Sequence, residues 1–322
     1  MLRMTVLGRA LISRERGALA GQLFGLYLAR FLHAGFPVLA GKEALVKLRK
    51  KTGYSFVNCK KALEKFDDVK EAEVWLHEQA QKEGWSKASK LRGRKTQEGL
   101  IGLLQEGNSA VMVEVNCETD FVARNVKFQH LVQQVAIGTM LHYRGTRNQL
   151  STYAKCFLTS SELSQLRTGC DGSLLMDQLA LATGKLGENM VLKRAVWVLV
   201  PEKFFIGSYV HGALPEGNPA LSNMLFGKYG ALVICSPSEQ SEKSDFAELG
   251  WRLGQHVVGM APLSIGSLED EPGGDCETKM LAQPFLLDPT ISLGQYVQPT
   301  GVSVLDFVRF ECGEDTELST SE

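Results

Sequence analysis

Apolar residues between positions 42 and 82 recur with the spacing of an α-helix, in three short runs. The first run ends at Thr52 and Gly53, where a glycine is a common helix stop. Ser55 can cap the second run, and Asp67-Asp68 can cap the third. The pattern therefore predicts a small module of three helices at residues 42–82.

Beyond residue 97, short apolar runs typical of strands alternate with longer runs of helical spacing. The predicted elements in chain order are strands 100–104 and 110–115, helix 128–136, strands 205–210 and 231–235, helix 246–258 and a last strand at 302–310. Two strands and a helix thus occur twice. This repeat predicts an α+β fold whose core consists of two related α/β subdomains with antiparallel sheets, formed by duplication.

A basic segment, residues 83–97, separates the helical module from the core. Its run Lys87–Lys95 has no apolar period. Charge runs usually stay exposed, so a solvated tether is favoured over an RNA contact, for which Trp85 and a few cations are a weak footprint. The remaining predicted divisions are core subdomains at residues 98–196 and 197–313, and an acidic, disordered tail at residues 314–322.

The first 41 residues have a composition of their own. They contain five arginines, a single acid (Glu15) and, before Lys42, no lysine. An Arg-rich, acid-poor start is typical of a mitochondrial targeting segment, so residues 1–41 predict import into the mitochondrial matrix. The apolar run Leu19–Ala29 is too short to span a bilayer, and we expect no membrane partner.

The overall composition excludes several classes of function. The formal net charge is −1, which gives no global attraction to nucleic acid. The seven cysteines are odd in number, scattered and without a Cys-x-x-Cys pair, which argues against a disulfide framework and a zinc site. Gly184-Lys185 lacks the upstream glycine of a phosphate-binding loop. We therefore expect no cofactor, no metal and no enzyme active site.

An unusual segment follows the strand that ends near Val115. Thr119 can cap the next turn, and Asp120 suits the positive end of a helix. Phe121 stands in this corner between a strand and a helix, beside acids, where it could face a partner. Large aromatic residues are usually buried, so the residues alone favour a Phe121 that packs into the core.

Residues 116–123, Asn-Cys-Glu-Thr-Asp-Phe-Val-Ala, resemble the core signature of the elongation factor Ts family. Residues 48–64 resemble the family's ubiquitin-associated-like N-terminal module. Further segments that resemble the family, in the same order, are 187–195, 207–212, 283–289 and 307–311. The resemblance extends from about Lys42 to Gly313 and is therefore more specific than any single motif.

The resemblance implies an exchange factor that binds mitochondrial elongation factor Tu and speeds GDP release, without chemistry of its own. By position, Asp120 and Phe121 would press on the partner's GTPase domain and disturb its magnesium and phosphate site. The other contact residues that the resemblance implies are Thr119, Lys60, Leu186, Gly187 and His211.

The chain also departs from the family's bacterial pattern. An acidic Gly-Pro loop at residues 269–275 replaces a helical hairpin, and the terminal helix is missing. Both losses resemble the mitochondrial branch. Two other functions stay open on the residues alone: an adaptor for ubiquitin-like proteins or RNA, built on the helical module and basic segment, and an enzyme that uses the cleft between subdomains.

Overall fold

The computed structural model describes residues 36–315, apart from residue 53 and residues 146–149, 170–171, 213–222, 239–240, 242–244 and 275. Side chains of residues 36–41 are also outside the description. Most of the predicted targeting segment and of the predicted acidic tail therefore lies outside the described residues. The chain divides into two compact units, residues 1–80 and 81–322.

The first unit contains α2 (Phe36–Thr52), α3 (Phe56–Lys65) and the first half of α4 (Val69–Leu91). Ser55 caps α3 by accepting a hydrogen bond from the Asn58 amide, and Asp68 accepts one from the Lys70 amide at the start of α4. Buried side chains from all three helices form its core: Leu45, Leu48, Cys59, Ala62, Ala72 and Leu76. The predicted three-helix module is confirmed, although α2 begins before residue 42.

Helix α4 corrects the prediction of a solvated tether at residues 83–97. The helix continues to Leu91, and its second half packs on α8 (Leu175–Leu186) within the second unit. Gly84 lies so close to Ala180 that an added Cβ would be 2.4 Å from that carbonyl oxygen. Trp85 Nε1 donates to Asp177, and Lys87 Nζ donates to the Gly184 carbonyl. The close approach of Gly84 to α8 and two polar contacts thus hold this segment on the core, although its charge pattern is typical of a linker.

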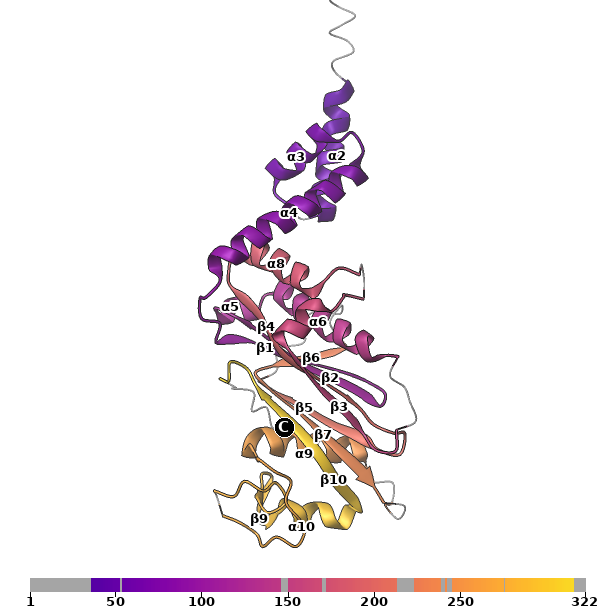
Figure 1. The fold of residues 1–322 in the computed structure, drawn as a ribbon, viewed down its shortest axis with the longest axis vertical. Helices are drawn as coiled ribbons and strands as arrows, with labels where there is room; N and C mark the ends of the chain where they lie inside the picture. Colours follow the sequence, from indigo (N-terminus) through magenta and orange to yellow (C-terminus); the bar gives the residue numbers. More distant parts are fainter. Residues whose placement is uncertain are drawn as a thin grey trace, which may run out of the picture. The chain divides into compact units, whose positions relative to one another are not determined.

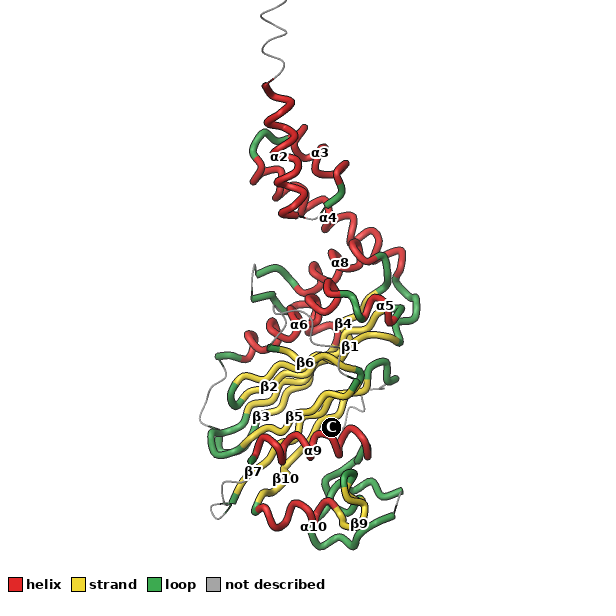
Figure 2. Tube along the Cα trace, turned by 180° about the vertical axis from the view of Figure 1, so that it is seen from behind, coloured by secondary structure: helices red, strands yellow, loops and turns green. Residues whose placement is uncertain are grey.

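The core of the second unit consists of two antiparallel sheets (Figures 1 and 2). The five-stranded sheet has the order β3 (Ala154–Thr159), β4 (Met190–Leu199), β2 (Ser109–Cys117), β1 (Glu98–Glu106) and β6 (Met224–Gly227). The three-stranded sheet has the order β10 (Val302–Glu311), β7 (Tyr229–Pro237) and β5 (Phe205–His211). The other elements are α5 (Asp120–Ala123), α6 (Val126–Tyr143), α7 (Ser160–Gln165), α9 (Phe246–Met260), β8 (Pro284–Phe285), β9 (Asp288–Ser292), α10 (Leu293–Val297) and the 3₁₀ turn Gln298–Thr300.

Strand periodicity explains how these elements form layers. Val111 and Val113 on β2 point into the core beneath α6, whereas Met112 between them points toward the second sheet. On β7, Leu232 meets that inner layer and Val233 faces α9. The unit therefore has four layers, helix, sheet, sheet and helix, with buried apolar side chains between each pair.

The predicted pairs of strands, each covered by a helix, are present: β1 and β2 under α6, and β5 and β7 under α9. One strand crosses between the halves, because β6 pairs with β1 and places Met224 and Phe226 in the core under α6. The predicted boundary at residue 197 falls inside β4. The predicted elements did not include β3, β4, α7 or α8; β3 and α7 are short, whereas β4 and α8 consist mostly of apolar residues.

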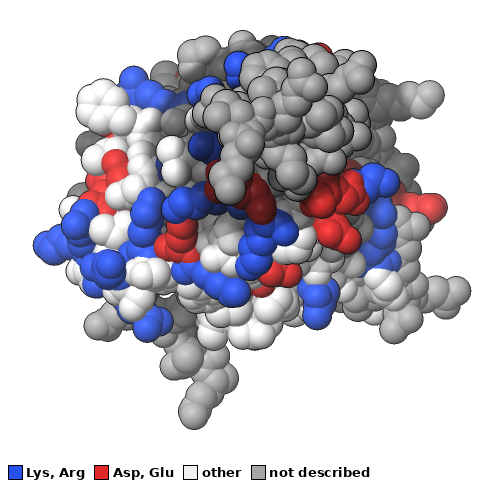
Figure 3. Space-filling model, turned by 90° about the horizontal axis from the view of Figure 1, so that it is seen from above, with Lys and Arg blue, Asp and Glu red and all other residues white. Residues whose placement is uncertain are grey.

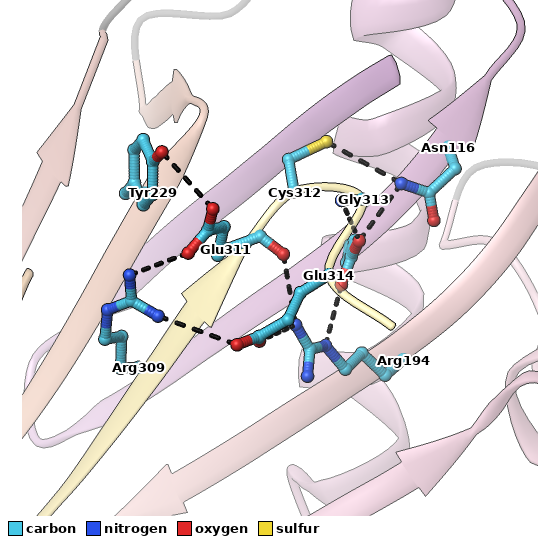
Figure 4. Close-up of polar contacts among 9 residues, drawn as sticks. Asn116, Arg194, Tyr229, Arg309, Glu311, Cys312, Gly313 and Glu314 are labelled. Atoms are coloured by element: carbon cyan, nitrogen blue, oxygen red, sulfur yellow. Dashed lines mark hydrogen bonds and ion pairs between the residues drawn. The ribbon is translucent and has the colours of Figure 1, made fainter. Parts of the chain in front are cut away.

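A buried polar cluster closes one end of the layer between the sheets (Figure 4). The Glu114 carboxylate is fully buried and accepts from Arg194 Nε at 2.7 Å, from Asn116 Nδ2 at 3.0 Å and from the Gly313 amide at 2.8 Å. Arg194 also reaches Glu314 at 3.3 Å. These contacts tie the C-terminal end of β10 to β2 and β4, and Asn116, the first residue of the signature segment, is part of the cluster.

Candidate functional site: the Thr119–Phe121 corner

The residues that follow β2 form a short, capped turn. Thr119 has extended backbone angles, and its hydroxyl accepts a hydrogen bond from the Val122 amide, so α5 begins at Asp120. Val122 and Ala123 occupy the buried side of this turn. Phe121 is on the other side and is 82% exposed, more than any other large apolar residue among those described. The expectation that Phe121 packs into the core is wrong, because the next two residues, Val122 and Ala123, occupy the buried side of the turn.

Charge around the corner is mixed. Asp120 forms an ion pair with Arg124 at 3.2 Å, one helical turn later. Burial, and secondarily the neighbouring Lys127, lowers the pKa of Lys185. Acidic and basic side chains also lie side by side elsewhere, on the face of the molecule that Figure 3 shows from above. At the corner, an exposed aromatic ring stands beside charges of both signs, a combination that suits a protein–protein contact.

The turn after α8 lies against this corner. Helix α8 ends at Leu186, and Gly187 closes it with a left-handed φ of 81° and an amide that donates to the Thr183 carbonyl at 2.9 Å. The next residue, Glu188, accepts hydrogen bonds from the amide and hydroxyl of Thr119, at 3.1 and 2.7 Å. Segments about seventy residues apart therefore meet, and the structure brings Leu186 and Gly187 to the Thr119–Phe121 corner as neighbours.

The remaining two predicted contact residues lie elsewhere. His211 is exposed at the end of β5 in the three-stranded sheet, where its Nδ1 is 3.2 Å from the Tyr209 hydroxyl. It lines an open cavity of about 450 Å³ together with Tyr229, Gln255 and Arg309. Lys60 belongs to the first unit, on α3, where it is exposed and 3.6 Å from Glu64.

Sequence reasoning missed the residues that hold the corner in place. Besides Glu188, these are Glu118, Asn189 and Cys117, whose thiol donates to the Thr119 carbonyl at 3.2 Å. Burial raises the pKa of Cys117 to about 12, so the group stays a thiol and is unsuited to nucleophilic chemistry. The segments 116–123 and 187–195, which resemble the family, contain Glu118, Glu188 and Asn189. Their place in these segments is the one feature of the sequence that could have marked them as part of the site.

Two further properties of the described residues concern metal binding and membrane insertion. Within the described parts of the chain, no three His, Cys, Asp or Glu side chains are grouped closely enough to hold a metal ion. Among the helices in those same parts, none is both long and apolar enough to cross a membrane.

Comparisons with known proteins agree with the motifs. The family model "Elongation factor Ts, mitochondrial, N-terminal" matches residues 29–86, and the model "Elongation factor TS" matches residues 118–270. Mitochondrial elongation factor Ts of Bos taurus is 68% identical over 88% of this chain and 83% of its own length. The Homo sapiens protein is 68% identical over 88% and 86%, and the Xenopus laevis protein is 64% identical over 90% and 92%.

Proposed function

The chain belongs to the elongation factor Ts family, and from this premise we propose that it is the guanine nucleotide exchange factor of mitochondrial elongation factor Tu. It binds the GDP form of that partner, speeds the loss of GDP and leaves the partner free to bind GTP during translation elongation. The single observation that carries the site is the exposure of Phe121, at 82%, on a capped turn within the family's signature.

The mechanism rests on linkage between two binding equilibria. A protein that binds nucleotide-free elongation factor Tu more tightly than the GDP form must weaken GDP binding by the same factor. The preference requires a contact that differs between the two forms. Phe121 supplies it by pressing on the GTPase domain as an apolar wedge, with Asp120 beside it, and this disturbs the magnesium and phosphate site. A central aromatic anchor contributes about 2 kcal/mol or more at a protein interface.

The other proposed contacts spread over both units of the chain. Leu186 and Gly187 extend the surface around Phe121, and His211 adds a second surface on the three-stranded sheet. Lys60 adds a third contact from the helical module. The chain acts by binding alone, without an active site, a cofactor or direct contact with nucleic acid.

The proposed location is the mitochondrial matrix. The Bos taurus and Homo sapiens relatives are named as mitochondrial proteins, and the Arg-rich composition of residues 1–41 has the character of a targeting segment. Elongation factor Tu of the same compartment is therefore the proposed partner.

The test is release of a fluorescent GDP from purified mitochondrial elongation factor Tu. The intact chain should accelerate release, and Phe121→Ala should reduce its efficiency about 30-fold, the equivalent of 2 kcal/mol. Leu263→Ala is the matched control, because Leu263 is also a large apolar residue and is 80% exposed. It should behave as the intact chain. A folded intact chain that fails to accelerate release would refute the proposed function.

A further inference from the structure

Two turns of the chain exchange carboxylate contacts at the proposed site. The Glu188 carboxylate accepts from the Thr119 amide at 3.1 Å and from the Thr119 hydroxyl at 2.7 Å. In return, the Glu118 carboxylate accepts from the Asn189 amide at 2.6 Å. Each turn thus supplies a glutamate to the backbone of the other, and we call this reciprocal arrangement of Glu118, Thr119, Glu188 and Asn189 the clasp.

The clasp is itself attached to the end of α4. Arg94 lies 3.5 Å from the Glu118 carboxylate, and the Arg94 carbonyl accepts from Asn189 Nδ2 at 2.9 Å. Hydrogen bonds with an ionised acceptor are stronger than neutral ones, so a clasp with two carboxylates is a firm connection for a surface turn. The clasp connects the end of β2, the turn after α8 and the segment at Arg94 that follows α4.

Thr119 is the point at which the clasp acts on Phe121. The Phe121 ring is almost fully exposed and has little packing of its own, so its position depends on the backbone that carries it. That backbone begins at Thr119, whose hydroxyl both donates to Glu188 and accepts from the Val122 amide. A fixed Thr119 therefore fixes the direction in which Phe121 leaves the surface.

We propose that Glu188 is a positioning residue of the exchange factor: through the clasp it holds the Thr119 turn so that Phe121 is already in its binding orientation before the partner arrives. This inference rests on the proposed function. A side chain ordered in advance loses less conformational freedom on binding, so preorganisation strengthens the interaction without any contact of its own. Glu188 acts on the partner only through Phe121.

The experiment is a double-mutant cycle on GDP release from elongation factor Tu, with Glu188→Ala, Phe121→Ala and the double variant of the full chain. Glu188→Ala should lower the efficiency of exchange about tenfold when Phe121 is present, the scale of one added ordering cost. In the Phe121→Ala background it should have no further effect. Non-additivity of this kind distinguishes a residue that acts through its neighbour from one that acts independently.

A second turn of the same chain offers a matched control. Glu162 accepts from the Thr159 amide at 2.7 Å and from the Thr159 hydroxyl at 2.8 Å, the same pair of bonds at the start of α7. Glu162→Ala should lower thermal stability to a similar extent and leave exchange unchanged. Thr119→Val removes the hydroxyl that donates to Glu188 and should lower nucleotide exchange as Glu188→Ala does.

Hydrogen exchange of backbone amides provides a readout that does not depend on the partner. Glu188→Ala should speed hydrogen exchange at the backbone amides of Thr119 and Val122, and Glu162→Ala should leave hydrogen exchange at these amides unchanged. The proposal is overturned if Glu188→Ala leaves nucleotide release unchanged, if it lowers release equally with and without Phe121, or if those amides keep their protection. If the intact chain fails to accelerate GDP release, the proposed function fails, while the amides still report whether the clasp orders the turn.

Discussion

His256 on α9 should make the second unit sensitive to mild acid. Its side chain is fully buried. The Nδ1 atom accepts from the Leu286 amide at 3.3 Å, so the proton of the neutral ring belongs on Nε2, which donates to Gln283 Oε1 at 3.1 Å. Gln283 is oriented in turn because its amide nitrogen donates to the carbonyls of Met260 and Glu277. The site accommodates only the neutral imidazole.

Burial lowers the pKa of His256 from 6.5 to about 4, despite the hydrogen bond to Gln283. Between these two values the unfolded chain binds a proton that the folded chain does not, so the free energy of unfolding falls as the pH falls. The full contribution is present above pH 6.5 and is lost by about pH 4. A difference of this size corresponds to about 3 kcal/mol, of which about 2 kcal/mol is already lost at pH 5.

Urea unfolding at pH 7.5 and pH 5, followed by circular dichroism and tryptophan fluorescence, measures this loss. His256→Gln should be less stable than the intact chain at pH 7.5, because it disturbs the buried network. Its stability should fall by about 2 kcal/mol less than that of the intact chain between the two pH values. Exposed His142→Gln is the control and should keep the full dependence. Equal losses in the intact chain and in His256→Gln would refute the reasoning.

Two further predictions concern stability. Arg194→Met should lower the free energy of unfolding by about 3–5 kcal/mol, because it leaves the Glu114 charge buried, and adding Glu114→Met should recover part of the loss; unchanged urea midpoints would contradict this. Gly207→Ala should lower the free energy of unfolding by up to about 3 kcal/mol, because the added Cβ would lie 2.6 Å from the Gly250 backbone. Gly187→Ala places its Cβ where no atom lies within 4 Å and should lower the free energy of unfolding by only about 1 kcal/mol, because of the positive φ at this position. Thermal midpoints in the reverse order would count against the structure at these glycines.

Hydrophobic spacing predicted the strongly patterned parts of the fold. Strands such as 110–115 and the helix at 246–258 carry unbroken apolar faces, and the structure contains both. Spacing gave little signal for β3 and α7, which are short and mixed in polarity, whereas β4 and α8 have apolar patterns and were still not predicted. Spacing also could not show that β6 joins the sheet of the other half, because strand pairing between distant segments depends on tertiary packing rather than on local pattern.

The candidate site shows a similar limit. Thr119 was predictable as a cap because a hydroxyl before a turn satisfies a free backbone amide. The exposure of Phe121 was not predictable, because no local pattern indicates that Val122 and Ala123 occupy the buried side of the turn. The contact between Glu188 and Thr119 joins residues that are 69 apart, so only the folded chain shows it. The residue types marked the corner as unusual but favoured a buried Phe121, and only the resemblance to the family implied that Phe121 faces a partner.

The most direct test of the central claim is the affinity of the chain for mitochondrial elongation factor Tu, measured by calorimetry with nucleotide-free and with GDP-bound partner. Binding to the nucleotide-free form should be tighter, by the same factor by which the chain weakens the partner's affinity for GDP. Phe121→Ala should reduce that factor. Equal affinity for the two forms would mean that binding cannot shift the nucleotide equilibrium, and it would contradict the proposed exchange mechanism.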